Sequence, residues 1–115
     1  RGLGDVYKRQ PVSPDEVIAN LRAEQEEMQD WVSLAGLIGA CDIHARQATN
    51  EQVRDVRDAL KQEPSVRICI YDHQTPPPFA PYNDTIEKYF DLIMATEAQY
   101  DRLGLMSAML IDLVD

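Results

Sequence analysis

The sequence is short of basic residues, cysteines and long apolar runs, and each shortage argues against a class of protein. Its 115 residues hold 11 Lys and Arg against 20 Asp and Glu, for a formal net charge of −9. Direct nucleic-acid binding and anionic membrane surfaces both need clustered cations, so both are disfavoured. Two cysteines do not make a disulfide scaffold, so we expect a cytoplasmic protein. The longest apolar-rich run, residues 31–43, is shorter than a membrane span of about 20 residues.

The first ten residues resemble the in-frame translation of a transposon-based sequencing adapter, and RGLGDVYKRQ matches it at every position. We therefore expect residues 1–10 to be non-native, in a gene assembled from bulk metagenomic reads, and leave them out of fold reasoning. Residues 11–115 would form a single helical domain whose natural N-terminus is missing. The last helical stretch reaches Asp115 without a stop signal, which is compatible with truncation at the C-terminus too.

Helical periodicity and capping signals dominate the first half of the chain. Residues 13–16 (SPDE) combine a capping box, a proline at the first helical position and acidic residues that complement the helix dipole. From there we expect one continuous helix over residues 14–47, with a break near Gly36 as the alternative. A second capping box, Thr49 with Gln52, begins the next helix.

The second half contains one expected strand and two further helical stretches. Residues 66–71 (VRICIY) are β-branched and alternating, which predicts a strand. Residues 75–81 (TPPPFAP) predict an extended Pro-rich loop. Asn83 or Asp84 would cap the following helix, and residues 105–114 have the apolar spacing of a last amphipathic helix.

These elements predict a mainly α protein, a small bundle of three to four helices with one isolated strand or extended segment at residues 66–71. An isolated strand leaves amides and carbonyls unpaired. It would therefore pair with missing sequence, pair across a homodimer, or serve as a connector. The helix-then-strand order of residues 51–71 leaves open a second interpretation, a fragment of an α/β or α+β domain.

The chain's cysteines and histidines fall in two tight pairs, Cys41 with His44 and Cys69 with His73. Two of each is a common zinc ligand set, and on a helix the first pair would share a face. The second pair needs a turn, because an extended chain would separate its Cα atoms by about 13 Å. The alternative, which we prefer, is that both cysteines are small buried apolar groups and no cofactor binds.

Asp72 and His73 follow the expected strand. If that strand belongs to a parallel sheet, they lie at the edge where ligands usually bind, and they could do acid–base work. A nucleophile motif, a phosphate loop and paired metal carboxylates are all lacking. Whether the chain is an enzyme is left open, with a fragment of an enzyme or ligand-binding domain as one alternative and a zinc-stabilised domain as the other.

Our first hypothesis is a small acidic helical module that interacts with proteins or serves a structural role, with a protein partner or a homo-oligomer. Two sets of residues bear on it. An apolar set could line a partner groove or belong to the core: Trp31, Met94, Met106 and Met109. An acidic set could meet a basic partner or be a solvated face: Glu24, Glu26, Glu27 and Asp30.

Overall fold

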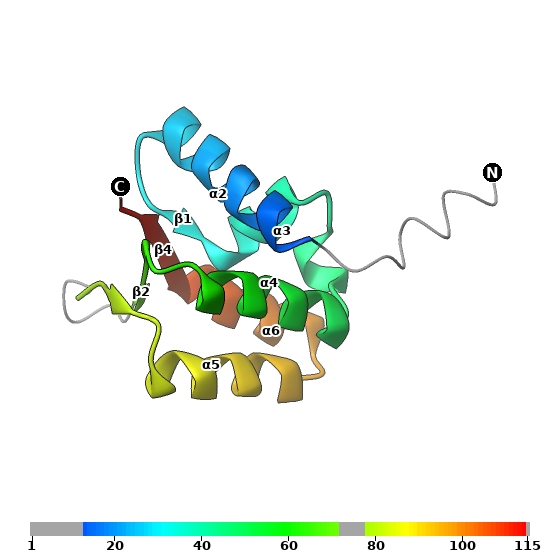
Figure 1. The fold of residues 1–115 in the computed structure, drawn as a ribbon. Coiled ribbons are helices and arrows are strands. Elements are labelled where there is room, and N and C mark those ends of the chain that lie inside the picture. The colour runs from blue at the N-terminus through cyan, green and yellow to red at the C-terminus, as the bar shows by residue number, and fades with distance from the viewer. Residues whose placement is uncertain (1–12, 72–77, 115) are drawn as a thin grey trace, which may run out of the picture.

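A computed structural model describes residues 13–71 and 78–114 and folds them as a mixed α+β protein (Figure 1). The helices are α2 (Pro14–Met28), α3 (Leu34–Ala40), α4 (Asn50–Gln62), α5 (Asp84–Ala95) and α6 (Gln99–Ala108), with a 3-10 turn η1 (Ala45–Gln47). The strands are β1 (Val32–Ser33), β2 (Val66–Ile70), β3 (Ala80–Pro81) and β4 (Met109–Leu113). The expected helical character is confirmed, but the chain also builds a sheet.

The four strands form one antiparallel sheet in the order β1-β4-β2-β3. Strand β2 lies where the sequence predicts it, yet the prediction that it is isolated is wrong. It pairs along its whole length with β4, from Val66 opposite Leu113 to Ile70 opposite Met109. Strand β2 therefore finds its main pairing partner within this chain, and the pairing needs neither missing sequence nor a second copy.

The prediction of a final helix over residues 105–114 is wrong in its second half. Helix α6 passes through Gly104 and ends at Ala108, where β4 begins. The residues of β4 alternate between buried and half-buried, with Met109, Ile111 and Leu113 facing the core. The apolar residues at positions 105, 106, 109, 110 and 113 fit a helical period, and those at 109, 111 and 113 fit a strand, so periodicity alone could not decide between a helix and a strand.

The continuous helix predicted over residues 14–47 is also wrong, and its break lies before Gly36. Helix α2 ends at Gln29, which takes the left-handed conformation (φ 54°) and donates its N–H to the Gln25 carbonyl at 2.8 Å. The chain then enters β1, and Ser33 caps α3 by accepting the Gly36 N–H at 3.0 Å. Pairing of β1 with β4 needs this break, and such a long-range contact leaves no local signal.

The capping signals have mixed outcomes. Thr49 and Gln52 form the predicted reciprocal box, with hydrogen bonds of 2.9 and 3.1 Å, and Asn83 caps α5 through the amides of Thr85 and Ile86. Ser13 is the N-cap residue of α2, but its side chain makes no cap hydrogen bond, so the box expected with Glu16 does not form.

The core lies between the helices and one face of the sheet, and in Figure 1 strands β2 and β4 lie to one side of α2, α4 and α6. Its largest fully buried side chains are Phe90, Leu21, Leu34, Leu37, Ile38, Leu60, Ile68, Ile93, Met106, Met109, Ile111 and Val17. Two of the predicted groove residues, Met106 and Met109, are thus core. No helix in residues 13–71 and 78–114 is long and apolar enough to cross a membrane.

Two leucines on helices provide a matched test of this core. Leu21 on α2 is fully buried, whereas Leu92 on α5 is 50% exposed. We expect Leu21→Ala to lower the free energy of unfolding by about 2 to 5 kcal/mol, through lost burial and the cavity left behind. Leu92→Ala should cost less than about 0.5 kcal/mol. Urea unfolding measures both, and equal losses would contradict this assignment of the core.

Candidate functional site

The residues of the first predicted metal pair, Cys41 and His44, lie beyond the end of a helix. Helix α3 ends at Ala40, and Asp42 turns the chain in a left-handed conformation (φ 64°). The helix on which Cys41 and His44 would share a face therefore does not form, and their role as a pair of metal ligands stays a prediction. Burial raises the pKa of the Cys41 thiol, and a hydrogen bond from Asn20 to its Sγ (3.5 Å) offsets this only in part. A protonated thiol is a poor metal ligand and nucleophile.

Cys69 lies in the middle of β2 and is 3% exposed. Among the residues that the structure describes, no group of three or more Cys, His, Asp and Glu could hold a metal ion. His73 and Asp72 lie outside the described residues, so the four-ligand zinc site and the acid–base pair both stay predictions. Nothing in the described part of the chain adds to either of them.

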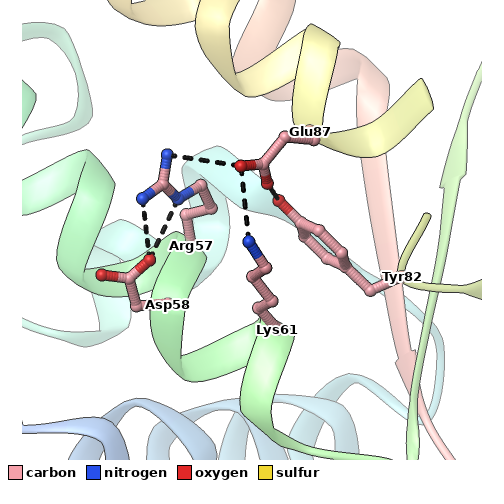
Figure 2. A network of polar contacts seen from close by, with 5 residues as sticks. All are labelled: Arg57, Asp58, Lys61, Tyr82 and Glu87. Atoms are coloured by element: carbon pink, nitrogen blue, oxygen red, sulfur yellow. Dashed lines mark hydrogen bonds and ion pairs between the residues drawn. The ribbon is translucent and has the colours of Figure 1, made fainter. Parts of the chain in front are cut away.

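A polar network that the sequence did not reveal joins α4, the segment after β3 and α5 (Figure 2). The Tyr82 hydroxyl donates a hydrogen bond to Glu87 at the start of α5. Glu87 also accepts from Lys61 at 3.4 Å and lies 3.8 Å from the Arg57 guanidinium. Arg57 in turn bonds to Asp58 at 2.9 Å. Arg57 and Lys61 are four residues apart on α4, so both reach the same side.

Each charged side chain in this network lies beside an opposite charge. This arrangement suits holding the two helices and the segment after β3 together better than it suits catalysis. The hydrogen bond from Tyr82, aided by Lys61 and Arg57, lowers the pKa of Glu87. Burial and the neighbouring carboxylate raise the pKa of Tyr82, which keeps its phenol protonated. The Tyr82 ring also stacks on the core residue Phe90 and lies 5.8 Å from the Lys61 ammonium. The network therefore anchors α5 and the end of β3 to α4.

The outer face of the sheet is the second candidate site. We use this name for the side chains of Ser33, Arg67, Cys69, Leu110, Asp112 and Pro81, which the register places opposite the core-facing residues. Cys69 is buried although it does not belong to the continuous core cluster. Other residues therefore cover Cys69, and if the register of β2 with β3 continued by one residue, Phe79 would lie opposite it.

An aromatic pair lies at this outer face. Trp31 precedes β1 at one edge of the sheet and Phe79 precedes β3 at the other, yet their rings stack with centroids 4.9 Å apart and planes at 30°. The pair thus joins two residues whose neighbouring strands lie at opposite edges of the sheet. Trp31 nonetheless keeps 40% of its surface exposed, and Tyr71 at the end of β2 keeps 39%.

A groove lies next to Trp31, between the C-terminal end of α2 and the end of β4. It is lined by Gln25, Glu26, Gln29, Asp30, Trp31 and Asp112. Gln25 is held firmly, because its amide accepts from the Leu113 N–H at 2.8 Å and donates to the Leu113 carbonyl at 3.1 Å. Strand β1 pairs with β4 only at Leu110 and Ile111, so it does not reach Leu113. There the Gln25 side chain makes the two backbone hydrogen bonds that a neighbouring strand would make. The groove therefore has a fixed wall, an exposed indole and three carboxylates.

Comparison with known proteins adds no functional information. A scan against protein-family models, a search of curated proteins and a search of solved structures each found no match to this chain. The case for function therefore depends on the geometry of the outer face and its groove.

Sequence reasoning identified part of this surface and missed the rest. Glu26 and Asp30 are exposed, as a solvated acidic face predicts, whereas Trp31, which the sequence allows either in a groove or in the core, is 40% exposed. Phe79 was assigned only to the Pro-rich loop, and Asp112 to a helix. The alternation of residues 109–113 was the available signal for Asp112, whereas the stacking of Phe79 on Trp31 depends on sheet order and has no sequence signature.

The polar network predicts a specific pH dependence. Because folding lowers the pKa of Glu87, its stabilisation is present above the ordinary pKa of 4.5 and is lost as pH falls through the lower folded value. We expect Glu87→Gln to lower the free energy of unfolding by about 1 kcal/mol at pH 7, a modest loss because the contacts of Glu87 with Lys61 and Arg57 are partly exposed. The loss should become progressively smaller below pH of about 4. Urea unfolding across this pH range measures the difference.

Tyr82→Phe serves as the companion variant, because it removes the hydrogen bond to Glu87 but keeps the ring on Phe90. Its cost should also shrink in acid, since protonated Glu87 needs the phenol less. A cost of Glu87→Gln that is constant with pH would show that the network does not contribute through charge.

Proposed function

We propose that this chain is a protein-interaction module that binds its partner through the outer face of the sheet, next to Trp31 and Phe79. The observation that carries the proposal is the stacked aromatic pair, which joins residues next to the two edge strands while Trp31 stays 40% exposed. Tryptophan is enriched at the energetic centres of protein interfaces, because a large rigid ring buries much area at little entropic cost.

The surroundings of the pair support an interface more than a catalytic centre. Its neighbours combine a half-buried apolar residue, Leu110, with exposed or half-buried polar groups such as Arg67, Ser33 and Asp112. An apolar centre within a polar rim is the usual anatomy of a protein-binding surface. The polar network of Figure 2 fits the same proposal, since it fixes the segment that follows Phe79 to the helical layer.

A peptide-display selection on the folded chain tests this proposal. We expect it to enrich peptides with micromolar affinity, and Trp31→Ala to weaken their binding about tenfold or more, as loss of a central aromatic does. Fluorescence anisotropy of labelled peptides measures the dissociation constants, and circular dichroism checks that the variant remains folded.

Tyr100→Ala is the matched control, because Tyr100 is an aromatic residue that is 82% exposed, on α6 rather than at the sheet. It should leave the affinity unchanged, and Trp31→Phe should retain part of it. The proposal fails if selection enriches no peptide, or if the peptides bind equally well to Trp31→Ala.

A further inference from the structure

We infer that the groove beside Trp31 takes an arginine- or lysine-bearing extended segment of a protein partner, with the cationic group on the indole. This inference rests on the proposed function and specifies the chemistry of the partner. It joins three observations at one place: a hollow in the surface, an exposed indole within it, and carboxylates on its walls.

The indole provides the contact that selects a cation. Tryptophan offers the strongest cation–π surface of the aromatic side chains, and a guanidinium also stacks on it as a flat group. Stacking on Phe79 holds the Trp31 ring in place, so little rotamer freedom is left to lose on binding. Two contacts fix the backbone that carries the Trp31 ring. Gln29 makes a left-handed turn, and the Asp30 carboxylate accepts a hydrogen bond from the backbone N–H of Trp31 at 2.8 Å.

The walls provide the opposite charge. Glu26 and Asp30 come from the end of α2 and Asp112 from β4, and none of them forms an ion pair within residues 13–71 and 78–114. The cations closest by spacing are Arg22, one turn before Glu26, and Arg67, opposite Asp112 in register, and neither lines the groove. A cationic side chain entering the groove would therefore meet an excess of carboxylates.

The same charge distribution argues against a second copy of this chain as the occupant. Each copy carries a formal net charge of −9, so two copies meeting at acidic grooves would repel one another. A basic partner is instead drawn towards the groove and held by it. Gln25, fixed by its two hydrogen bonds to Leu113, keeps the wall in place whether or not the groove is occupied.

The chain has one tryptophan, so fluorescence excited selectively at the indole, where the tyrosines do not absorb, reports on Trp31 alone. The probes are three five-residue peptides, valine- and threonine-based, that differ only at the centre: arginine, its neutral isostere citrulline, or glutamate. We expect the arginine peptide to shift the Trp31 emission and to bind about fivefold or more tightly than the citrulline peptide. Raising the salt from about 0.05 M to about 0.5 M should remove much of this preference.

Two conservative variants test the walls. Glu26→Gln and Asp112→Asn keep shape and remove charge, and each should weaken the arginine peptide about threefold while leaving the citrulline peptide unchanged. Asp91→Asn, an exposed carboxylate on α5, is the control and should change neither.

The outcomes separate the inference from the proposed function. Equal binding of the arginine and citrulline peptides, both lost in Trp31→Ala, would overturn the inference and leave the interaction module standing. Light scattering that shows a dimer dissociated by Trp31→Ala would also overturn it, in favour of self-association. If no probe perturbs Trp31 and display selection also enriches nothing, both the inference and the proposed function fail.

Discussion

Strand β2 pairs with β4 along its whole length, and this long-range contact sets the positions of the other elements. Five register pairs join residues 66–70 to residues 109–113, and everything between them, including β3, α5 and α6, is a connection that must return to the same place. Closing so long a loop costs conformational entropy before any contact forms. The burial of Val66, Ile68 and Ile111 against the helices compensates for that cost.

Once β2 and β4 pair, the two faces of the sheet have different environments. Strict alternation sends one set of side chains into the core and the other set to the outer face. The edge strands β1 and β3 are only two residues long, which limits unwanted pairing with other chains. These short strands nevertheless position Trp31 and Phe79, so the candidate binding surface forms only once the edge strands have joined the sheet.

The connection between β2 and β4 needs its own attachment, and the network around Glu87 provides it. Tyr82 lies just after β3, Glu87 in the first turn of α5, and both reach the cations of α4. The charges of Glu87, Arg57 and Lys61 are paired and partly exposed, so the network contributes modestly to the free energy of unfolding. Its more specific effect is to hold α5 and the segment after β3 in one position on α4. Helix α4 therefore contributes buried side chains to the core and also holds α5, which lies in the connection between β2 and β4.

Local sequence signals were enough to predict the start of α2 at Pro14, the reciprocal box at Thr49, the Asn83 cap and the position of β2. Those depend on contacts within a few residues, which a single sequence displays. Long-range contacts, in contrast, make residues 109–113 a strand, end the first helix at Gln29 and place Phe79 on Trp31. Each of these requires residues distant in the chain to meet, and the free energy that selects them comes from burial and cross-strand pairing, which local pattern does not encode.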